Sequence, residues 1–69
     1  MTSDVPIRDE MIRLGQFLKL AGAIDSGSDV KVILAADDVT VNGEIEHRRG
    51  RQLVKGDVVT LGDLRLRVG

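Results

Sequence analysis

The spacing of apolar residues predicts a short helix near the start of the chain. Four of them recur with the helical spacing i, i+3, i+4 and i+7: Leu14, Phe17, Leu18 and Ala21. Gly22 follows directly, and glycine suits the left-handed conformation that ends many helices. Residues 14–21 are therefore expected to form a helix with one buried stripe.

A second helix is expected a few residues later. Ser26 followed by Asp29 resembles a capping box, with Asp in the position where Glu is usual. The buried face of this helix would be formed by Val30, Ile33 and Leu34. Because the link between the two apolar stripes is short, the sequence predicts a compact helix–loop–helix.

Beyond residue 38 the apolar period changes from the helical repeat toward the alternation of strands. Val39 and Val41 flank a polar residue, and Asn42-Gly43 is the pair best suited to a type I′ turn. Residues 44–46 would form the returning strand. This segment is therefore predicted to be a β-hairpin.

A second hairpin is expected around Gly62-Asp63, between strands at residues 58–61 and 64–68. Three residues of its last strand are expected to face the core: Leu64, Leu66 and Val68. The arginines between them would share the exposed face, where they would protect a sheet edge from further pairing: Arg65 and Arg67.

These elements together predict an α+β fold, a helix–loop–helix packed on one face of a small, mostly antiparallel β-sheet. Residues 5–8 would add an edge strand, a position in which Pro6 is tolerated. The 69 residues suffice for one domain, spanning residues 1–69, and are too few for a second core.

The charge of the chain is unevenly distributed, although the formal net charge is only −1. Residues 1–46 contain four basic and nine acidic residues, whereas residues 47–69 contain six basic and two acidic ones. Three of the ten basic residues lie within four positions: Arg48, Arg49 and Arg51. A phosphate responds to local potential within roughly 8–10 Å, so this cluster indicates a phosphate-bearing partner. Taken alone, the same run is more often a solvated loop than a binding surface.

Catalysis has little support in the sequence. There is no cysteine, and the single histidine, His47, lies in the basic run rather than beside a nucleophile. No spaced ligand set for a metal and no glycine-rich phosphate loop is present. The apolar runs are far too short to span a membrane. We therefore expect a non-catalytic cytoplasmic protein with no cofactor, no metal, no small-molecule substrate and no membrane association.

The order of the segments resembles the S4 RNA-binding domain, which occurs in a ribosomal protein, pseudouridine synthases and tyrosyl-tRNA synthetases. The resemblance rests on FLKL at residues 17–20, VTVNG at 39–43, the basic run, and KGDVV at 55–59. It covers about residues 12–61. LGQFLKLAGAIDSG and NGEIEHRRGRQLVKGDVV are also similar to the small stand-alone bacterial S4 proteins.

The resemblance implies RNA binding through the helix–loop–helix face and the adjoining basic loop. Six residues are the expected RNA contacts: Lys19, Lys31, Arg48, Arg49, Arg51 and Lys55. Gly27 stands where many S4 domains have an arginine, so more of the affinity is expected to come from the basic loop. Because the one aromatic residue, Phe17, belongs to the core stripe, recognition should rest on RNA shape and phosphates, as in structured RNA, ribosomal or other.

A different interpretation stays open at this point. The basic loop could dock on an acidic protein, which would make the domain a protein–protein adaptor, and the net acidity of the chain favours this. Lys19 and Lys31, taken alone, could be ordinary surface lysines. We expect a monomer in either case.

Overall fold

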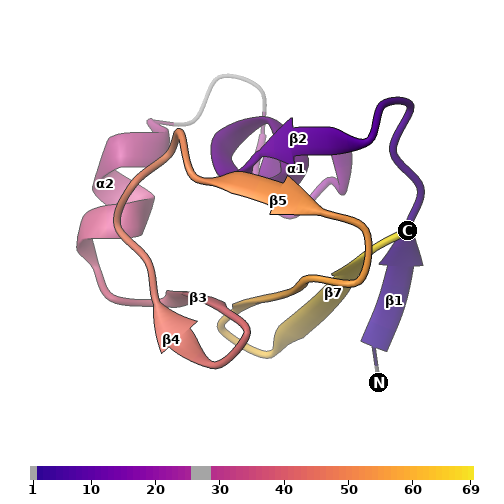
Figure 1. Cartoon of the computed structure of the whole chain (residues 1–69). Coiled ribbons are helices and arrows are strands. Elements are labelled where there is room, and N and C mark those ends of the chain that lie inside the picture. The colour runs from indigo at the N-terminus through magenta and orange to yellow at the C-terminus, as the bar shows by residue number, and fades with distance from the viewer. Residues whose placement is uncertain (1, 26–28) are drawn as a thin grey trace.

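The described residues of the protein form two short helices and two β-sheets. The structure is a computed structural model that describes residues 2–25 and 29–69. Along the chain the elements are β1 (Thr2–Val5), β2 (Met11–Arg13), α1 (Leu14–Leu20), α2 (Val30–Ala35), β3 (Val39–Val41), β4 (Glu44–Ile45), β5 (Gln52–Val54), β6 (Val58–Leu61) and β7 (Leu64–Val68) (Figure 1). The expectation of two helices with a mostly antiparallel sheet is confirmed.

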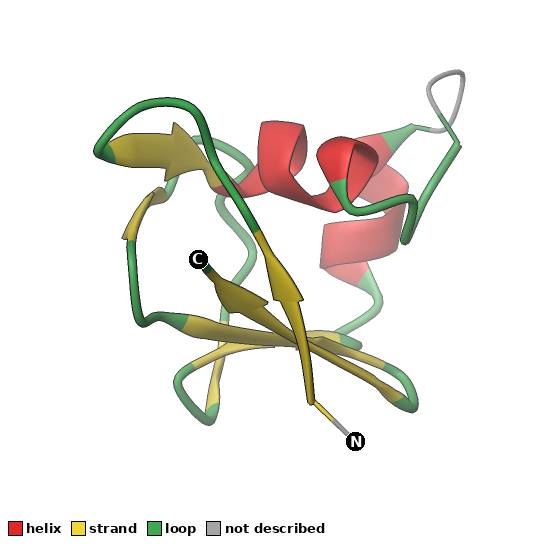
Figure 2. Cartoon of the chain, turned by 90° about the vertical axis from the view of Figure 1, so that its right-hand side faces the viewer, coloured by secondary structure: helices red, strands yellow, loops and turns green. Residues whose placement is uncertain are grey.

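Five strands form the larger sheet in the order β1-β7-β6-β3-β4, and β2 and β5 form a separate two-stranded sheet. All pairings are antiparallel except that of β1 with β7, so the larger sheet is mixed. Both helices and the two-stranded sheet lie on the same side of the larger sheet (Figure 2). The core fills the space between these two layers.

Helix α1 forms where the apolar stripe predicts it. Leu14, Phe17 and Leu18 are fully buried, and each such side chain stabilises the fold by about 1.5–3 kcal/mol through its removal from water. Gly22 has φ +74°, and its N–H donates to the Lys19 carbonyl at 3.1 Å. The glycine therefore ends the helix in the left-handed conformation, as expected.

Helix α2 begins at Val30, with Asp29 as its N-cap. The Asp29 carboxylate accepts a hydrogen bond from the Lys31 N–H at 3.0 Å. Val30 and Leu34 are buried, and Ile33 is half-buried, so the predicted face does pack on the core. The predicted capping residue Ser26 and the glycine at position 27 lie outside the described residues, and the loop of the helix–loop–helix stays a prediction.

The first hairpin has the predicted turn. Asn42 and Gly43 have φ +53° and +87°, and positive values at both central positions are the mark of a type I′ turn. Val39 and Val41 are buried, and they pair with Leu61 and Val59 of β6. The hairpin therefore forms one end of the larger sheet, with β3 paired to the central strand β6 and β4 at the edge.

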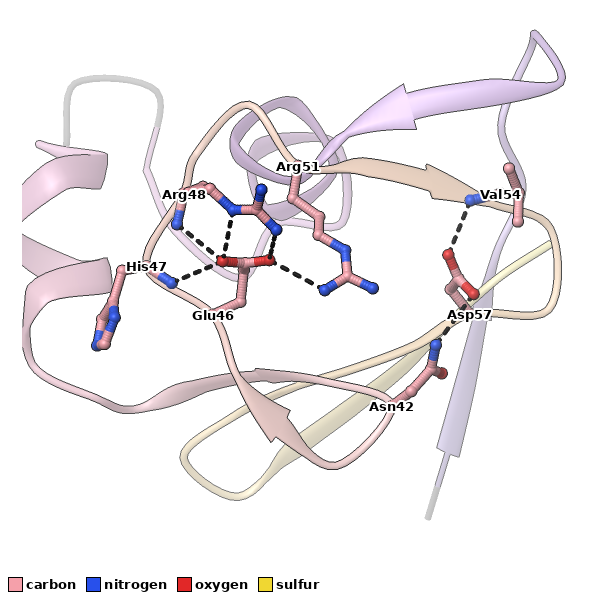
Figure 3. Close-up of polar contacts among 7 residues, drawn as sticks. All are labelled: Asn42, Glu46, His47, Arg48, Arg51, Val54 and Asp57. Atoms are coloured by element: carbon pink, nitrogen blue, oxygen red, sulfur yellow. Dashed lines mark hydrogen bonds and ion pairs between the residues drawn. The ribbon is translucent and has the colours of Figure 1, made fainter.

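Asn42 also links the first hairpin to the turn that follows β5. Its amide donates to the Asp57 carboxylate at 3.1 Å, and its side-chain oxygen accepts from the Val58 N–H at 2.9 Å. Asp57 in turn accepts from the Val54 N–H at 2.9 Å (Figure 3). Two segments that look like independent turns in the sequence, N-G and K-G-D, are thus parts of one hydrogen-bonded structure.

We predict that Asn42→Ala lowers the free energy of unfolding by about 2 kcal/mol, because alanine loses both hydrogen bonds and disfavours a positive φ. Asn42→Gly keeps the backbone conformation and loses only the bonds, so it should cost about half as much. Urea denaturation of both variants measures the two contributions separately. Equal losses in the two variants would contradict this division.

The second hairpin differs in one position from its prediction. Leu66 and Val68 of β7 are buried, but Leu64 has 47% of its surface exposed. Leu64 is the first residue of the strand, directly after the Gly62-Asp63 turn, and its side chain is not fully covered. The alternation of apolar residues therefore predicts the strand correctly, but the expectation that its first side chain is buried is wrong.

The N-terminal strand corrects two predictions. It spans Thr2–Val5 rather than residues 5–8, and it ends before Pro6, which has no N–H to donate. Because it pairs with β7 in parallel, β7 lies inside the sheet, and its arginines do not protect an edge. Arg67 instead donates to the Asp4 carboxylate at 2.8 Å, and this bond lowers the pKa of Asp4.

The two-stranded sheet was not predicted. Its strands have three residues each, too few to show a period, and they are far apart in the sequence. Ile12 pairs with Leu53, which is fully buried. This pairing brings the segment before β5 against the beginning of α1, where the candidate site lies.

Candidate functional site

The basic run of the sequence forms the connection between β4 and β5. Residues 46–51 have no regular secondary structure and are here termed the arginine loop. All of its residues are exposed except Glu46, which is buried, and Arg51, which is half-buried. A buried carboxylate at the start of a basic loop gives this loop its internal order.

Glu46 binds both the backbone and the side chains of the arginine loop (Figure 3). One carboxylate oxygen accepts from the backbone N–H groups of His47 and Arg48, at 3.1 and 3.2 Å. The guanidinium of Arg48 donates to both oxygens, at 3.2 and 3.1 Å, and Arg51 donates at 3.0 Å. One side chain thus fixes the path of the loop and the directions of two arginines.

These contacts stabilise the ionised carboxylate. The hydrogen bond from Arg48 is the largest cause that lowers the pKa of Glu46 to about 2, and Arg51 adds to it, while burial acts in the opposite direction. The Glu46 side chain is only 8% exposed, whereas that of Arg48 is 75% exposed. Arg48 therefore keeps most of its surface available to solvent or to a ligand.

The arginine loop is docked on the beginning of α1 through its carbonyl groups. The N–H groups of Leu14 and Gly15 donate to the carbonyls of Arg51 and Arg49, both at 2.9 Å. The helix has no side-chain N-cap, and these carbonyls take its place. A Cβ at Gly15 would stand 3.5 Å from Arg49, an ordinary van der Waals distance, so the loop packs directly against this turn of the helix.

Two further contacts hold the ends of the loop. The Arg13 guanidinium donates to the Gly50 carbonyl at 2.9 Å, from the residue just before α1. His47 pairs with the carboxylate of Asp37, the left-handed residue that follows α2. The arginine loop is therefore attached to the segments that flank both helices.

An open pocket of about 260 Å³ lies between α1 and the arginine loop. We term it the basic pocket, and its lining residues are Arg13, Gly15, Gln16, Lys19, Val30, Arg49 and Gly50. Among the residues that the structure describes, its three cations take part in no ion pair. Three uncompensated positive charges around one hollow attract an anion, and arginine matches the geometry of phosphate.

The structure unites two of the six predicted contacts, Lys19 and Arg49, in the basic pocket. Arg48 and Arg51 lie beside it but are bound to Glu46. Lys31 is exposed on α2, next to a pocket residue, and its own side chain does not line the hollow. Lys55 lies beyond the opposite end of β5 from the arginine loop.

Sequence reasoning did not identify Arg13, Gln16 or Glu46 as parts of the site. Gln16 and Lys19 are three positions apart in the sequence and share an exposed helix face, which was a usable signal for Gln16. Glu46 precedes arginines by two and five positions, which is a weak signal. Nothing in the sequence places Arg13 beside Gly50, because that contact depends on the pairing of β2 with β5.

None of the helices in the described part of the chain is long and apolar enough to cross a membrane. In the same part of the chain, no group of three or more histidine, cysteine or carboxylate residues is arranged to hold a metal ion.

Comparisons with known proteins agree with this arrangement. A family model described as S4 domain matches residues 5–69. The chain is also similar to the probable ribosome maturation protein RlbA of Bacillus subtilis, with 51% identity over 61 residues, 88% of this chain and 86% of the relative. The resemblance stated from the motifs is thus confirmed, and the chain belongs to the S4 domain family.

Proposed function

We propose that this protein is a non-catalytic RNA-binding module that acts as a monomer in the cytoplasm and recognises structured RNA by its phosphates. The observation that carries the proposal is the basic pocket, where Arg13, Lys19 and Arg49 converge from two segments of the chain. Membership of the S4 domain family supports an RNA-related role. The name of the Bacillus relative, a probable ribosome maturation protein, favours ribosomal RNA as the ligand.

The basic pocket suits an RNA backbone that bends into it. The guanidinium of Arg49 can hold two phosphate oxygens, and Lys19 adds a mobile point charge from the helix. Gly15 and Gly50 have no side chains that would keep a phosphate from the backbone. Arg13 has one N–H donor committed to the Gly50 carbonyl, and other donors of its guanidinium remain for a ligand.

The other predicted contacts have a supporting place in this proposal. Arg48 and Arg51 raise the positive potential beside the pocket, although Glu46 neutralises part of it. Lys31 would contact RNA that continues along α2. Lys55, at the other end of β5, would be reached only by an RNA that extends across the two-stranded sheet.

Shape and phosphate positions, rather than base stacking, are expected to provide the selectivity. The chain has one Phe and no Tyr or Trp, and Phe17 is fully buried, so none of these rings is available to stack an unpaired base. A folded RNA presents phosphates from two strands at fixed separations. The arginine loop, held against the start of α1 by Arg13 and shaped internally by Glu46, would match such a pattern together with the helix–loop–helix face.

The proposal is tested by titrating the isotope-labelled protein with a folded ribosomal RNA fragment and recording amide shifts. We expect shifts at Arg13–Lys19 and in the arginine loop, and a log affinity that falls with log salt at a slope of about −3, for roughly three phosphate contacts. An unstructured RNA of the same length is the control and should bind more weakly. Absence of binding to folded RNA at low salt would contradict the proposal and favour docking of the loop on an acidic protein.

A further inference from the structure

A second hollow, distinct from the basic pocket, lies between the segment that follows α1 (residues 22–25), α2 and the end of β6. Its volume is about 560 Å³, and none of its lining residues belongs to the basic pocket. Four branched apolar side chains line it, together with two alanines: Ile24, Val32, Ile33, Leu61, Ala23 and Ala36. Val32 has 66% of its surface exposed, so a partner that enters the groove can reach it.

The charged residues at this groove are carboxylates. Asp25 and Asp38 line it, and neither takes part in an ion pair within the described part of the chain. No lysine or arginine is among its lining residues. We term this surface the acidic groove. It repels RNA and is complementary to a positively charged partner with an apolar side chain.

We propose that the acidic groove binds a basic segment of a partner protein. An aliphatic or aromatic side chain of the segment enters between Val32 and Leu61, and flanking lysines or arginines pair with Asp25 and Asp38. The apolar contact supplies most of the affinity, and the carboxylates select for basic segments over acidic ones. Because the groove and the basic pocket share no residue, the protein can hold RNA and a basic protein at the same time.

The test uses a synthetic peptide of lysines and leucines as a probe. When it is added to the isotope-labelled full chain, we expect amide shifts at Gly22–Asp25, Val32–Ala36 and Leu61, and none at Arg49. A peptide of glutamates and leucines should leave the groove amides unshifted, because the carboxylates repel it, and one of lysines and serines should shift them only at much higher concentration. Shifts of the groove amides by the acidic peptide at equal concentration would overturn the proposal.

Two variants separate groove binding from general attraction to an acidic surface. Val32→Ser should lower the affinity for the lysine–leucine peptide roughly tenfold, and Asp38→Asn should lower it roughly threefold at low salt. Val54→Ser and Asp63→Asn are matched controls, since they change exposed residues outside the groove and should leave affinity unchanged. All four residues are exposed, so the variants should fold.

Three other outcomes would each overturn the proposal. They are shifts of the groove amides by RNA, self-association of the protein that Val32→Ser abolishes, and equal loss of affinity in the control variants. RNA binding at the basic pocket is measured separately, on the same variants. Val32→Ser should leave it unchanged, so failure of the groove is distinguishable from failure of the RNA-binding proposal.

Discussion

Changing Lys19 and Arg49 together to glutamate is expected to weaken binding of structured RNA about a hundredfold at physiological salt. Both side chains line the basic pocket, from different segments, and neither has an ion-pair partner among the described residues. Each change removes a phosphate contact and adds a repulsion, and together they oppose binding by roughly 3 kcal/mol. Fluorescence anisotropy with a labelled ribosomal RNA fragment at several salt concentrations measures the loss. The salt slope should fall by about 2.

A matched control has the same change of net charge outside the pocket. Arg8 and Arg65 are exposed and do not line the basic pocket, so their joint change to glutamate should cost less than about fivefold. Circular dichroism verifies that both double variants are folded. Equal losses in the two would mean that binding follows overall charge, and the basic pocket would not be the site.

Glu46→Gln is expected to lower the free energy of unfolding by about 2 kcal/mol near neutral pH. Glutamine can accept from one of the loop N–H groups, but it cannot provide the charge that binds Arg48 and Arg51. Both arginines can regain water, because their side chains are 75% and 31% exposed, and this limits the loss. Urea denaturation followed by circular dichroism measures it.

The pH dependence of this effect distinguishes an ion pair from simple packing. Because the folded state lowers the pKa of Glu46 from 4.5 to about 2, the carboxylate stabilises the fold fully above about pH 4.5. That contribution is lost as the pH falls toward 2. The stability curves of the native protein and Glu46→Gln should therefore converge at low pH. Glu44→Gln, at an exposed neighbour, is the control and should change neither curve. A gap that stays constant from neutral pH to about pH 2 would show that the charge is not responsible.

Local chemistry explains which parts of the fold could be predicted. The helix at Leu14 and the turn at Asn42-Gly43 depend on residues within a few positions of one another, so their periods and turn residues are visible in the sequence. The strand at residues 2–5 depends instead on β7, more than sixty residues away. No local pattern indicates whether such a strand pairs, in which direction, or where it ends, apart from the stop at Pro6.

The candidate site shows the same division. Lys19 and Arg49 were predicted as RNA contacts from the resemblance to the S4 domain, and Arg49 also belongs to the charge cluster. The two side chains lie together because backbone hydrogen bonds join α1 to the arginine loop. Such bonds leave no pattern of side chains in the sequence. The density of arginines indicated a ligand surface but did not indicate that Glu46 holds two of them. A cluster of charges in a sequence indicates a local electrostatic potential. Whether each arginine is available to a ligand depends on its partners in the fold, here the buried Glu46.

The parallel pairing of β1 with β7 has a consequence for the time at which the fold is completed. The β3–β4 hairpin joins residues that are close in the sequence, so it can pair before β7 has been made. β1 is synthesised before this hairpin, yet it can pair only after Leu64–Val68 exist. Until then its partner edge on the sheet is absent, and closing the intervening loop adds an entropic cost. Although β1 precedes the other elements in the sequence, it can therefore join the sheet only after β7 has been made.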